Sequence, residues 1–198
     1  MNIAIIGATG NFGIPFTAKL LSNPNYQLTL ISKSAGNIYE DSHRVVARSI
    51  DATNQKELKE LLENQDIVYC AVSGEDQNVI ARNLVELNVK RLIYMTVVGI
   101  YNELPKDNGD EYNLENEKEQ IPNRNAVDII EESNLDYTIL RSGYIIYEND
   151  DECIITKKGQ EAKGYISTYK SIEKIALEII ENPKMYSRES ISVTRDMS

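Results

Sequence analysis

Three observations predict that this chain is an α/β protein with a doubly wound parallel sheet. Short apolar runs typical of strands alternate with amphipathic helical stretches along nearly the whole sequence, and such alternation favours parallel strands joined by crossover helices. Three glycines stand between the first apolar run and the first helical stretch. The 198 residues suit one domain, and no linker, internal repeat or low-complexity segment divides them.

The individual elements follow from the spacing of apolar residues. Continuous or alternating apolar runs predict strands at 2–7, 27–32, 44–50, 66–72, 90–98, 136–142, 153–156 and 190–194. Apolar residues three and four positions apart predict helices at 12–22, 54–64, 76–88, 121–133 and 171–182. The acidic, polar stretch 99–118 predicts a long loop, which is either a lid or binding loop or a solvated surface excursion.

Composition narrows the classes of partner. A net charge of −10 disfavours nucleic acid and anionic membrane surfaces, although a local pocket can still hold an anion. No apolar run has the length of a membrane helix, and the first residues lack a secretory pattern. Two cysteines and one histidine disfavour a metal site. So few cysteines suit a reducing compartment, and we expect a cytoplasmic protein. Cys70 is expected to be buried and His43 to lie at the surface. The sequence leaves the oligomeric state open.

The glycine-rich turn "GATGNFG", residues 7–13, predicts a dinucleotide site. A pyrophosphate at this place would receive backbone N–H groups and the positive end of the helix dipole, and glycine removes the side chains that would block its approach. The strand before the turn and the helix after it are the context that supports this interpretation over a purely structural turn. The expected contacts from the turn are Gly7, Thr9, Gly10, Asn11, Phe12 and Gly13.

The ends of the next strands bear on which dinucleotide binds. An acid after the second strand would hold a ribose 2′-hydroxyl and favour NAD. The chain instead has Lys33 with the hydroxyl groups of Ser32 and Ser34, and no acid before Glu40. A lysine suits the 2′-phosphate of NADP, which is therefore the expected cofactor, with NAD possible and a solvated surface lysine as the alternative. Further expected cofactor contacts at the strand ends are Asp51, Ala52, Ala71, Val72 and Ser73.

Four stretches carry a resemblance to a known family. The turn "GATGNFG", the fifth strand "LIYMTVVGIY", the sixth strand "SNLDYTILRSGYI" and the closing region 166–193 resemble atypical short-chain dehydrogenase/reductase proteins. That NAD(P)H-binding group is related to NmrA-like, biliverdin-reductase-B-like and flavin-reductase-like proteins. The resemblance spans nearly the whole chain and implies a single NAD(P)-binding Rossmann-like domain, 1–198, with a small C-terminal extension. One departure is Arg141-Ser142, where the family has Arg-Pro.

A second departure concerns the chemistry. Typical short-chain dehydrogenases use a Tyr-x-x-x-Lys pair, and this chain has none; by the family's spacing the two positions fall on Glu119 and Asn123. The resemblance therefore implies either an NADP(H)-dependent oxidoreductase that reduces a small flavin-, quinone- or carbonyl-type acceptor without this pair, or a non-catalytic NAD(P) sensor of the NmrA-like type that regulates a partner. An epimerase or dehydratase of nucleotide sugars is a weaker alternative, since it normally needs the absent tyrosine.

Three further site residues are expected near the nicotinamide. Thr96 takes the position of the family's serine or threonine and is the catalytic candidate, because its hydroxyl can donate a hydrogen bond to a substrate carbonyl; a packed strand residue is the alternative. Ser142 and Gly143 are expected to line the nicotinamide pocket through backbone groups.

The remaining candidates are cationic or aromatic. Arg124 could clamp a phosphate or carboxylate by its planar fork, or simply be an exposed helix arginine. Arg141 is expected to satisfy backbone carbonyls or an acid at the end of a buried strand. Tyr101 is a candidate for a pocket wall, and Tyr144 is expected in the core.

Overall fold

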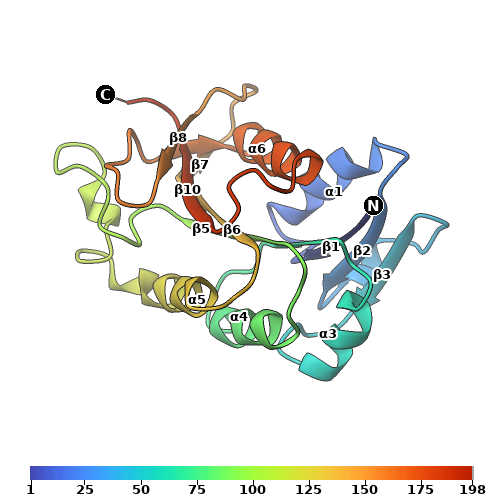
Figure 1. Ribbon diagram of the computed structural model, residues 1–198. Helices are drawn as coiled ribbons and strands as arrows, with labels where there is room; N and C mark the ends of the chain where they lie inside the picture. Colours follow the sequence, from blue (N-terminus) through green and yellow to red (C-terminus); the bar gives the residue numbers. More distant parts are fainter. Residues whose placement is uncertain (198) are drawn as a thin grey trace.

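The computed structural model describes residues 1–197 and is built around one eight-stranded sheet (Figure 1). The strand order is β3-β2-β1-β4-β5-β6-β10-β8, and every neighbouring pair is parallel except β10 with β8. The strands are β1 (Asn2–Ile6), β2 (Gln27–Ser32), β3 (Val45–Ser49), β4 (Ile67–Cys70), β5 (Leu92–Val97), β6 (Tyr137–Ser142), β8 (Ile154–Lys157) and β10 (Glu189–Thr194). The prediction of a doubly wound sheet is confirmed, with an antiparallel strand added at one edge.

Helices cover both faces of the sheet. The helices are α1 (Gly13–Leu21), α2 (Ala35–Ile38), α3 (Gln55–Leu62), α4 (Gln77–Glu86), α5 (Ile121–Glu131) and α6 (Tyr169–Glu181). In Figure 1, α1 and α6 lie on one side of the sheet and α3, α4 and α5 on the other. Alternate residues of β1 serve the two faces: Ile3 and Ile5 pack in the core with α1 and α6, and Ala4 and Ile6 in the core with α3, α4 and α5.

The C-terminal part contains elements that the sequence patterns did not predict. A separate two-stranded parallel sheet pairs β7 (Tyr144–Ile146) with β9 (Ile166–Thr168). Helix α6 begins at Tyr169, two residues before the predicted start, because Thr168 and Ser171 form a capping box in which each side chain hydrogen-bonds the other residue's backbone N–H.

The long segment after β5 is anchored to the protein instead of forming a solvated excursion. It contains two short 3₁₀ turns, Asp110–Tyr112 and Lys118–Gln120. The buried Asn113 side chain holds the segment together, accepting a hydrogen bond from the Leu104 N–H at 3.0 Å and donating one to the Leu104 carbonyl at 2.8 Å. Nearby, the Glu103 carboxylate forms a buried ion pair with Arg141 on β6.

The strand order fixes where a ligand can enter. β1 lies between β2 and β4, so the connections that leave β1 and β4 run in opposite directions. Their helices are packed on opposite faces of the sheet, which opens a crevice beyond the carboxyl ends of these strands. The glycine-rich turn directly follows β1 and therefore stands at this crevice.

Candidate functional site

A cleft of about 320 Å³ occupies the crevice beyond the carboxyl ends of β1 to β4. It is lined by Ile6, Gly7, Thr9, Gly10, Ser32, Lys33, Ser34, Ile50, Asp51, Ala52, Ala71, Val72, Ser73, Asp76 and Ile80. The residues that the sequence predicts at the ends of β2, β3 and β4 all appear in this lining. Asn11, Phe12 and Gly13 complete the turn into α1 beside it.

Backbone geometry explains the glycines of this turn. Gly7 has a φ of +86°, and a Cβ on it would stand 2.6 Å from the Ala71 carbonyl oxygen. A Cβ on Gly13 would overlap the Gly7 carbonyl oxygen and stand 2.7 Å from the Ala8 Cα. No side chain caps the N-terminus of α1 within the described chain. The Ile14 N–H donates to the Gly10 carbonyl and Pro15 has no N–H, so the N–H groups of Phe12 and Gly13 are the ones left for an anion. The turn therefore fits a bound pyrophosphate.

A chain of hydroxyl groups ties the glycine-rich turn to the end of β2. The Thr9 hydroxyl donates to Ser32 Oγ at 2.9 Å, and the Ser34 hydroxyl donates to Thr9 Oγ1 at 3.2 Å. The Tyr39 hydroxyl donates to the Ala8 carbonyl at 3.1 Å. These bonds hold the turn in one position, and Tyr39 is a residue that the sequence reasoning did not assign to the site.

Lys33 lies between two carboxylates at the edge of the cleft. Its ammonium group is 3.0 Å from Asp51 Oδ2 and 3.3 Å from Asp76 Oδ2. The pKa of Asp51 is lowered to about 2, first by the hydrogen bond from the Thr53 N–H and then by Lys33. Hydrogen bonds to the two carboxylates raise the pKa of Lys33. Lys33 and Asp51 are thus both charged at neutral pH, and the Lys33 ammonium group is engaged by two carboxylates.

Two residues of helix α4 shape this corner and were not predicted. Asp76 precedes the helix, where an acid is common at any helix start, so its sequence position carries no functional signal. Asn83 is buried and donates hydrogen bonds of 3.0 Å to the carbonyls of Ala52 and Thr53. An asparagine on an amphipathic helix normally faces solvent, so only the fold reveals that it positions the loop beside Asp51.

The expected nicotinamide residues stand at the ends of β5 and β6. Thr96 is 7 % exposed, and its hydroxyl has no hydrogen-bond partner among residues 1–197. The Ser142 hydroxyl donates to the Thr96 carbonyl at 3.2 Å. The Gly143 N–H donates to Ser167 Oγ at 2.7 Å, so it is already engaged within the protein. Thr96 is therefore the residue of this group with an unpartnered side-chain hydroxyl, although none of the three residues lines the cleft at the glycine-rich turn.

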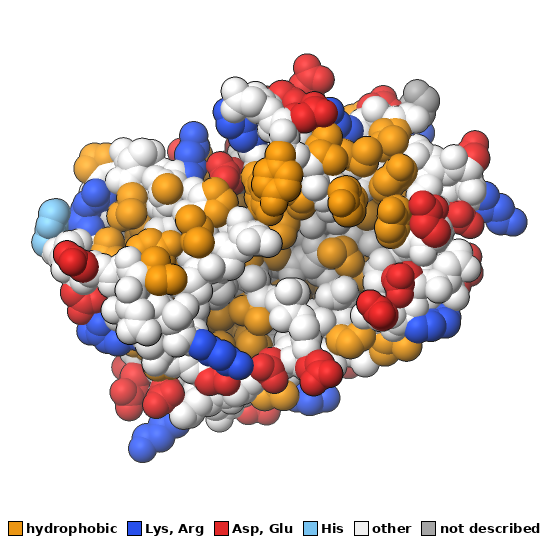
Figure 2. Space-filling model, turned by 180° about the vertical axis from the view of Figure 1, so that it is seen from behind, with side chains coloured by type: hydrophobic (Ala, Val, Ile, Leu, Met, Phe, Trp, Pro, Cys, Tyr) orange, Lys and Arg blue, Asp and Glu red, His pale blue; other side chains and the backbone are white. Residues whose placement is uncertain are grey.

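Aromatic side chains gather beside the glycine-rich turn. Tyr144 is 65 % exposed, so the expectation of a core tyrosine is wrong: it begins the short strand β7, which belongs to the separate two-stranded sheet. Tyr147 is 87 % exposed, and its ring centroid lies 5.6 Å from that of Tyr169. Tyr169 in turn makes an edge contact with Phe12 of the turn, at 5.3 Å. Figure 2 shows hydrophobic side chains gathered beside a hollow on the face behind that of Figure 1.

Arg124 and Tyr101 lie in a different pocket. The Arg124 guanidinium pairs with Asp128 at 2.6 Å and covers the Tyr101 ring at 4.6 Å from its centroid. Neither residue lines the cleft at the glycine-rich turn. Arg141 binds Glu103 and the Thr156 carbonyl, which confirms the expectation that it satisfies an acid and a backbone carbonyl.

Two searches of the described residues gave no site. No group of three or more histidine, cysteine or acidic side chains in that part of the chain could hold a metal ion. No helix between residues 1 and 197 combines the length and the apolar character needed to cross a bilayer.

Comparisons with known proteins place this cleft in context. A family model described as NAD(P)H-binding matches residues 7–183. No match was found among curated proteins. A Rossmann-fold NAD(P)-binding family protein from Shigella flexneri is 27 % identical with a TM-score of 0.84, over 100 % of this chain and 94 % of that one.

Two further solved structures share the fold at lower identity. A short-chain dehydrogenase/reductase from Veillonella parvula, solved in complex with NADP, is 24 % identical with a TM-score of 0.81, over 99 % of this chain and 95 % of that one. ChuY, an anaerobillin reductase from Escherichia coli O157:H7, is 15 % identical with a TM-score of 0.77, over 100 % of this chain and 98 % of that one.

Proposed function

The chain belongs to the NAD(P)H-binding family whose model matches residues 7–183, and from this premise we propose that it is an NADP(H)-dependent reductase of a small acceptor. The observation that carries the proposal is the cleft of about 320 Å³ beyond β1 to β4. It combines a glycine-rich turn with a helix N-terminus that no side chain caps within residues 1–197. Outside this lining, at the end of β5, the buried Thr96 hydroxyl has no partner among the same residues. These features fit a dinucleotide.

Each part of the site has a distinct task in this proposal. The N–H groups at the start of α1 receive the pyrophosphate, and the hydroxyl chain of Thr9, Ser32 and Ser34 holds the turn in place. The bound nicotinamide supplies a hydride. The Thr96 hydroxyl donates a hydrogen bond to the acceptor atom on which negative charge develops, and such a donor is worth most in a water-poor site. The proton would come from water or another group, since no Tyr-x-x-x-Lys pair is present.

The aromatic side chains that meet at Phe12 of the glycine-rich turn favour one shape of acceptor. Phe12, Tyr169 and Tyr147 follow one another at centroid distances of 5.3 and 5.6 Å. Flat conjugated rings stack on such side chains, so a flavin- or quinone-type acceptor is favoured over a small aliphatic carbonyl compound. The anaerobillin reductase of similar fold supports a conjugated acceptor in the same general way.

A reductase assay tests this function. The purified protein is expected to oxidise NADPH with at least one acceptor from a panel of flavins, quinones and carbonyl compounds, monitored by loss of NADPH absorbance. Thr96→Val keeps the shape of the side chain and removes the hydroxyl, so turnover should fall about tenfold or more while the dissociation constant for NADPH is unchanged. Tight NADPH binding without oxidation by any member of the panel would contradict the proposal.

A second candidate function is a non-catalytic sensor of the NADP pool. It is favoured by the residues at the two positions of the usual proton relay, an exposed Glu119 and a half-buried Asn123. Tyr101 is a poor substitute for the relay tyrosine, because burial raises its pKa and its hydroxyl is engaged by Glu131 and Ser190. A sensor would bind NADPH tightly, show no turnover in the same assay, and capture a partner protein only when NADP is present.

Choice between NADPH and NADH depends on Lys33 in this proposal. Calorimetry should give tighter binding of NADPH, and Lys33→Ala should remove that preference, a change of about tenfold for one charged contact to phosphate. Asp76→Asn should act in the opposite direction, because it frees Lys33 from one of its two carboxylates. NADH affinity serves as the internal control in both variants. Equal affinity of the unmodified protein for the two dinucleotides would exclude the role of Lys33.

A further inference from the structure

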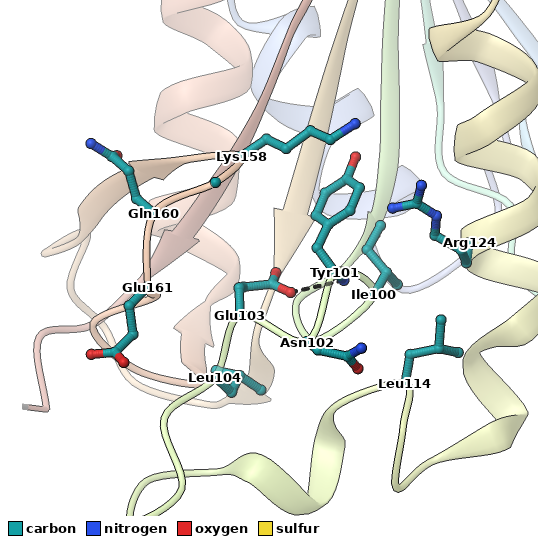
Figure 3. A pocket seen from close by; sticks show the side chains of 11 residues that line it. Ile100, Tyr101, Asn102, Glu103, Leu104, Leu114, Arg124, Lys158, Gln160 and Glu161 are labelled. Atoms are coloured by element: carbon teal, nitrogen blue, oxygen red, sulfur yellow. Dashed lines mark hydrogen bonds between the residues drawn. The ribbon is translucent and has the colours of Figure 1, made fainter.

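A second and larger pocket, of about 610 Å³, lies toward the β8 edge of the sheet. It is bounded by the segment after β5, by α5 and by the turn after β8 (Figure 3). Its lining consists of Ile100, Tyr101, Asn102, Glu103, Leu104, Leu114, Arg124, Lys158, Gly159, Gln160 and Glu161. None of these residues lines the cleft at the glycine-rich turn. We call it the Tyr101 pocket.

Three cations surround one aromatic ring in this pocket. The guanidinium groups of Arg124 and Arg141 lie 4.6 and 5.0 Å from the centroid of the Tyr101 ring, and the Lys158 ammonium lies 4.8 Å from it. In Figure 3 the ring stands between Lys158 and Arg124. The Tyr101 hydroxyl is fixed by hydrogen bonds to Glu131 and Ser190. The ring therefore helps to hold the Arg124 and Lys158 cations in defined places around it.

The charges around the ring are balanced. Each cation pairs with one carboxylate, in the pairs Arg124–Asp128, Lys158–Glu131 and Arg141–Glu103. The three paired positive and negative charges leave little net field, so a ligand with two negative charges gains little here. Glu161 also lines the pocket but is exposed to solvent, where water and salt screen its charge. One negative charge is accommodated more easily, provided that hydrogen-bond donors are available for it.

Such donors are present at the pocket. Arg124 binds Asp128 through Nε and Nη2, which leaves its Nη1 edge, and Lys158 uses one of its three N–H bonds on Glu131. The side-chain oxygen of Asn102 accepts a hydrogen bond from the Glu115 N–H at 2.8 Å. The NH₂ group of the Asn102 side chain can therefore donate to a ligand. The apolar side chains of Ile100, Leu104 and Leu114 line the same pocket as these donors.

We propose that the Tyr101 pocket binds a small organic acid with one carboxylate and an apolar body. The carboxylate lies between Arg124 and Lys158, where the guanidinium edge and the ammonium group each donate a charge-assisted hydrogen bond. The apolar body contacts Leu104 and Leu114. This site is separate from the dinucleotide cleft and does not depend on the reductase activity.

Binding of benzoate, with benzamide as its uncharged counterpart, tests the proposal directly. Benzoate should bind in the millimolar range and raise the melting temperature, and in methyl NMR spectra it should shift the signals of Leu104 and Leu114. Benzamide should have no such effect, because it lacks the charge. Phenyl phosphate should bind more weakly than benzoate, since the balanced pocket does not favour a second negative charge. Cyclohexanecarboxylate, an aliphatic acid of similar size, extends the probe set.

Charge-removing variants locate the effect. Arg124→Gln and Lys158→Gln should each lower benzoate affinity about tenfold, the typical worth of one charge-assisted bond. Lys157→Gln is the matched control, because Lys157 neighbours Lys158 in sequence but pairs with Glu189, and it should leave benzoate affinity unchanged. NADPH affinity should not change in any of the three. The proposal is overturned if neither acid binds the unmodified protein, if benzamide binds equally well, or if both variants retain full affinity.

Discussion

Replacing Glu103 with alanine is expected to lower the free energy of unfolding by about 3–5 kcal/mol, the typical cost of leaving one member of a buried ion pair alone. Arg141 is 1 % exposed and would lose the carboxylate that neutralises it. The Tyr101 N–H, which donates to Glu103 Oε2 at 2.9 Å, would lose its acceptor as well. For a chain of this size the change corresponds to a melting temperature lower by roughly 10 °C, measured by calorimetry and urea denaturation.

Two comparisons isolate this effect. Glu111→Ala removes an exposed carboxylate from the same segment and should change stability by less than about 0.5 kcal/mol. The double variant Glu103→Leu/Arg141→Met removes both charges and should recover part of the loss, since buried ion pairs are often replaceable by apolar side chains. A Glu103→Ala variant as stable as the Glu111→Ala variant would show that the ion pair does not anchor this segment.

Replacing Gly13 with alanine is expected to abolish measurable NADPH binding and to destabilise the fold. The added Cβ would overlap the carbonyl oxygen of Gly7 and approach the Ala8 Cα at 2.7 Å. Both are backbone atoms, so the whole turn must move and helix α1 must shift away from β1. Overpacking of this kind costs about 1–3 kcal/mol, and calorimetric titration should give a dissociation constant for NADPH at least about a hundredfold higher because the donors at the start of α1 are displaced.

Gly10→Ala separates binding from folding. Its Cβ would have only the Gly7 carbonyl oxygen nearby, at 3.2 Å, so the melting temperature should change little. Gly10 lines the cleft, and the methyl group would occupy space that the pyrophosphate needs. NADPH affinity should therefore fall about tenfold with stability retained. If Gly13→Ala kept full NADPH affinity, the turn would not be the pyrophosphate site.

The sequence predicts the sheet and the cleft well because both depend on local patterns. Alternating apolar runs locate the strands, and the glycine-rich turn identifies the switch point that the strand order then confirms. The resemblance to atypical short-chain dehydrogenase/reductase proteins is likewise confirmed by the family model and by structures of the same fold. Residues such as Thr9 and Lys33 lie in the cleft because they directly follow strands whose ends meet there.

The rest depends on contacts between distant parts of the chain. Asn83 supports the loop after β3 from another helix, and Asp76 reaches Lys33 across 43 positions. Nothing in the local sequence distinguishes either from a solvated polar residue. Tyr144 has an apolar neighbourhood in sequence, but its exposure follows from the short sheet of β7 and β9, whose partner strand comes 20 positions later. Such long-range pairing leaves no periodic signal.

The place of β10 in the sheet has a consequence for how the protein assembles. β10 is the last strand in the chain, yet it lies between β6 and β8, and β8 has no other neighbour in the sheet. During synthesis, β6 therefore presents an unpaired edge, and β8 waits without a partner until residues 189–194 leave the ribosome. Pairing across such sequence distances is slow, and unpaired edges favour association between chains. Completion of this sheet is thus a late event, and the newly made chain is most vulnerable to aggregation just before it.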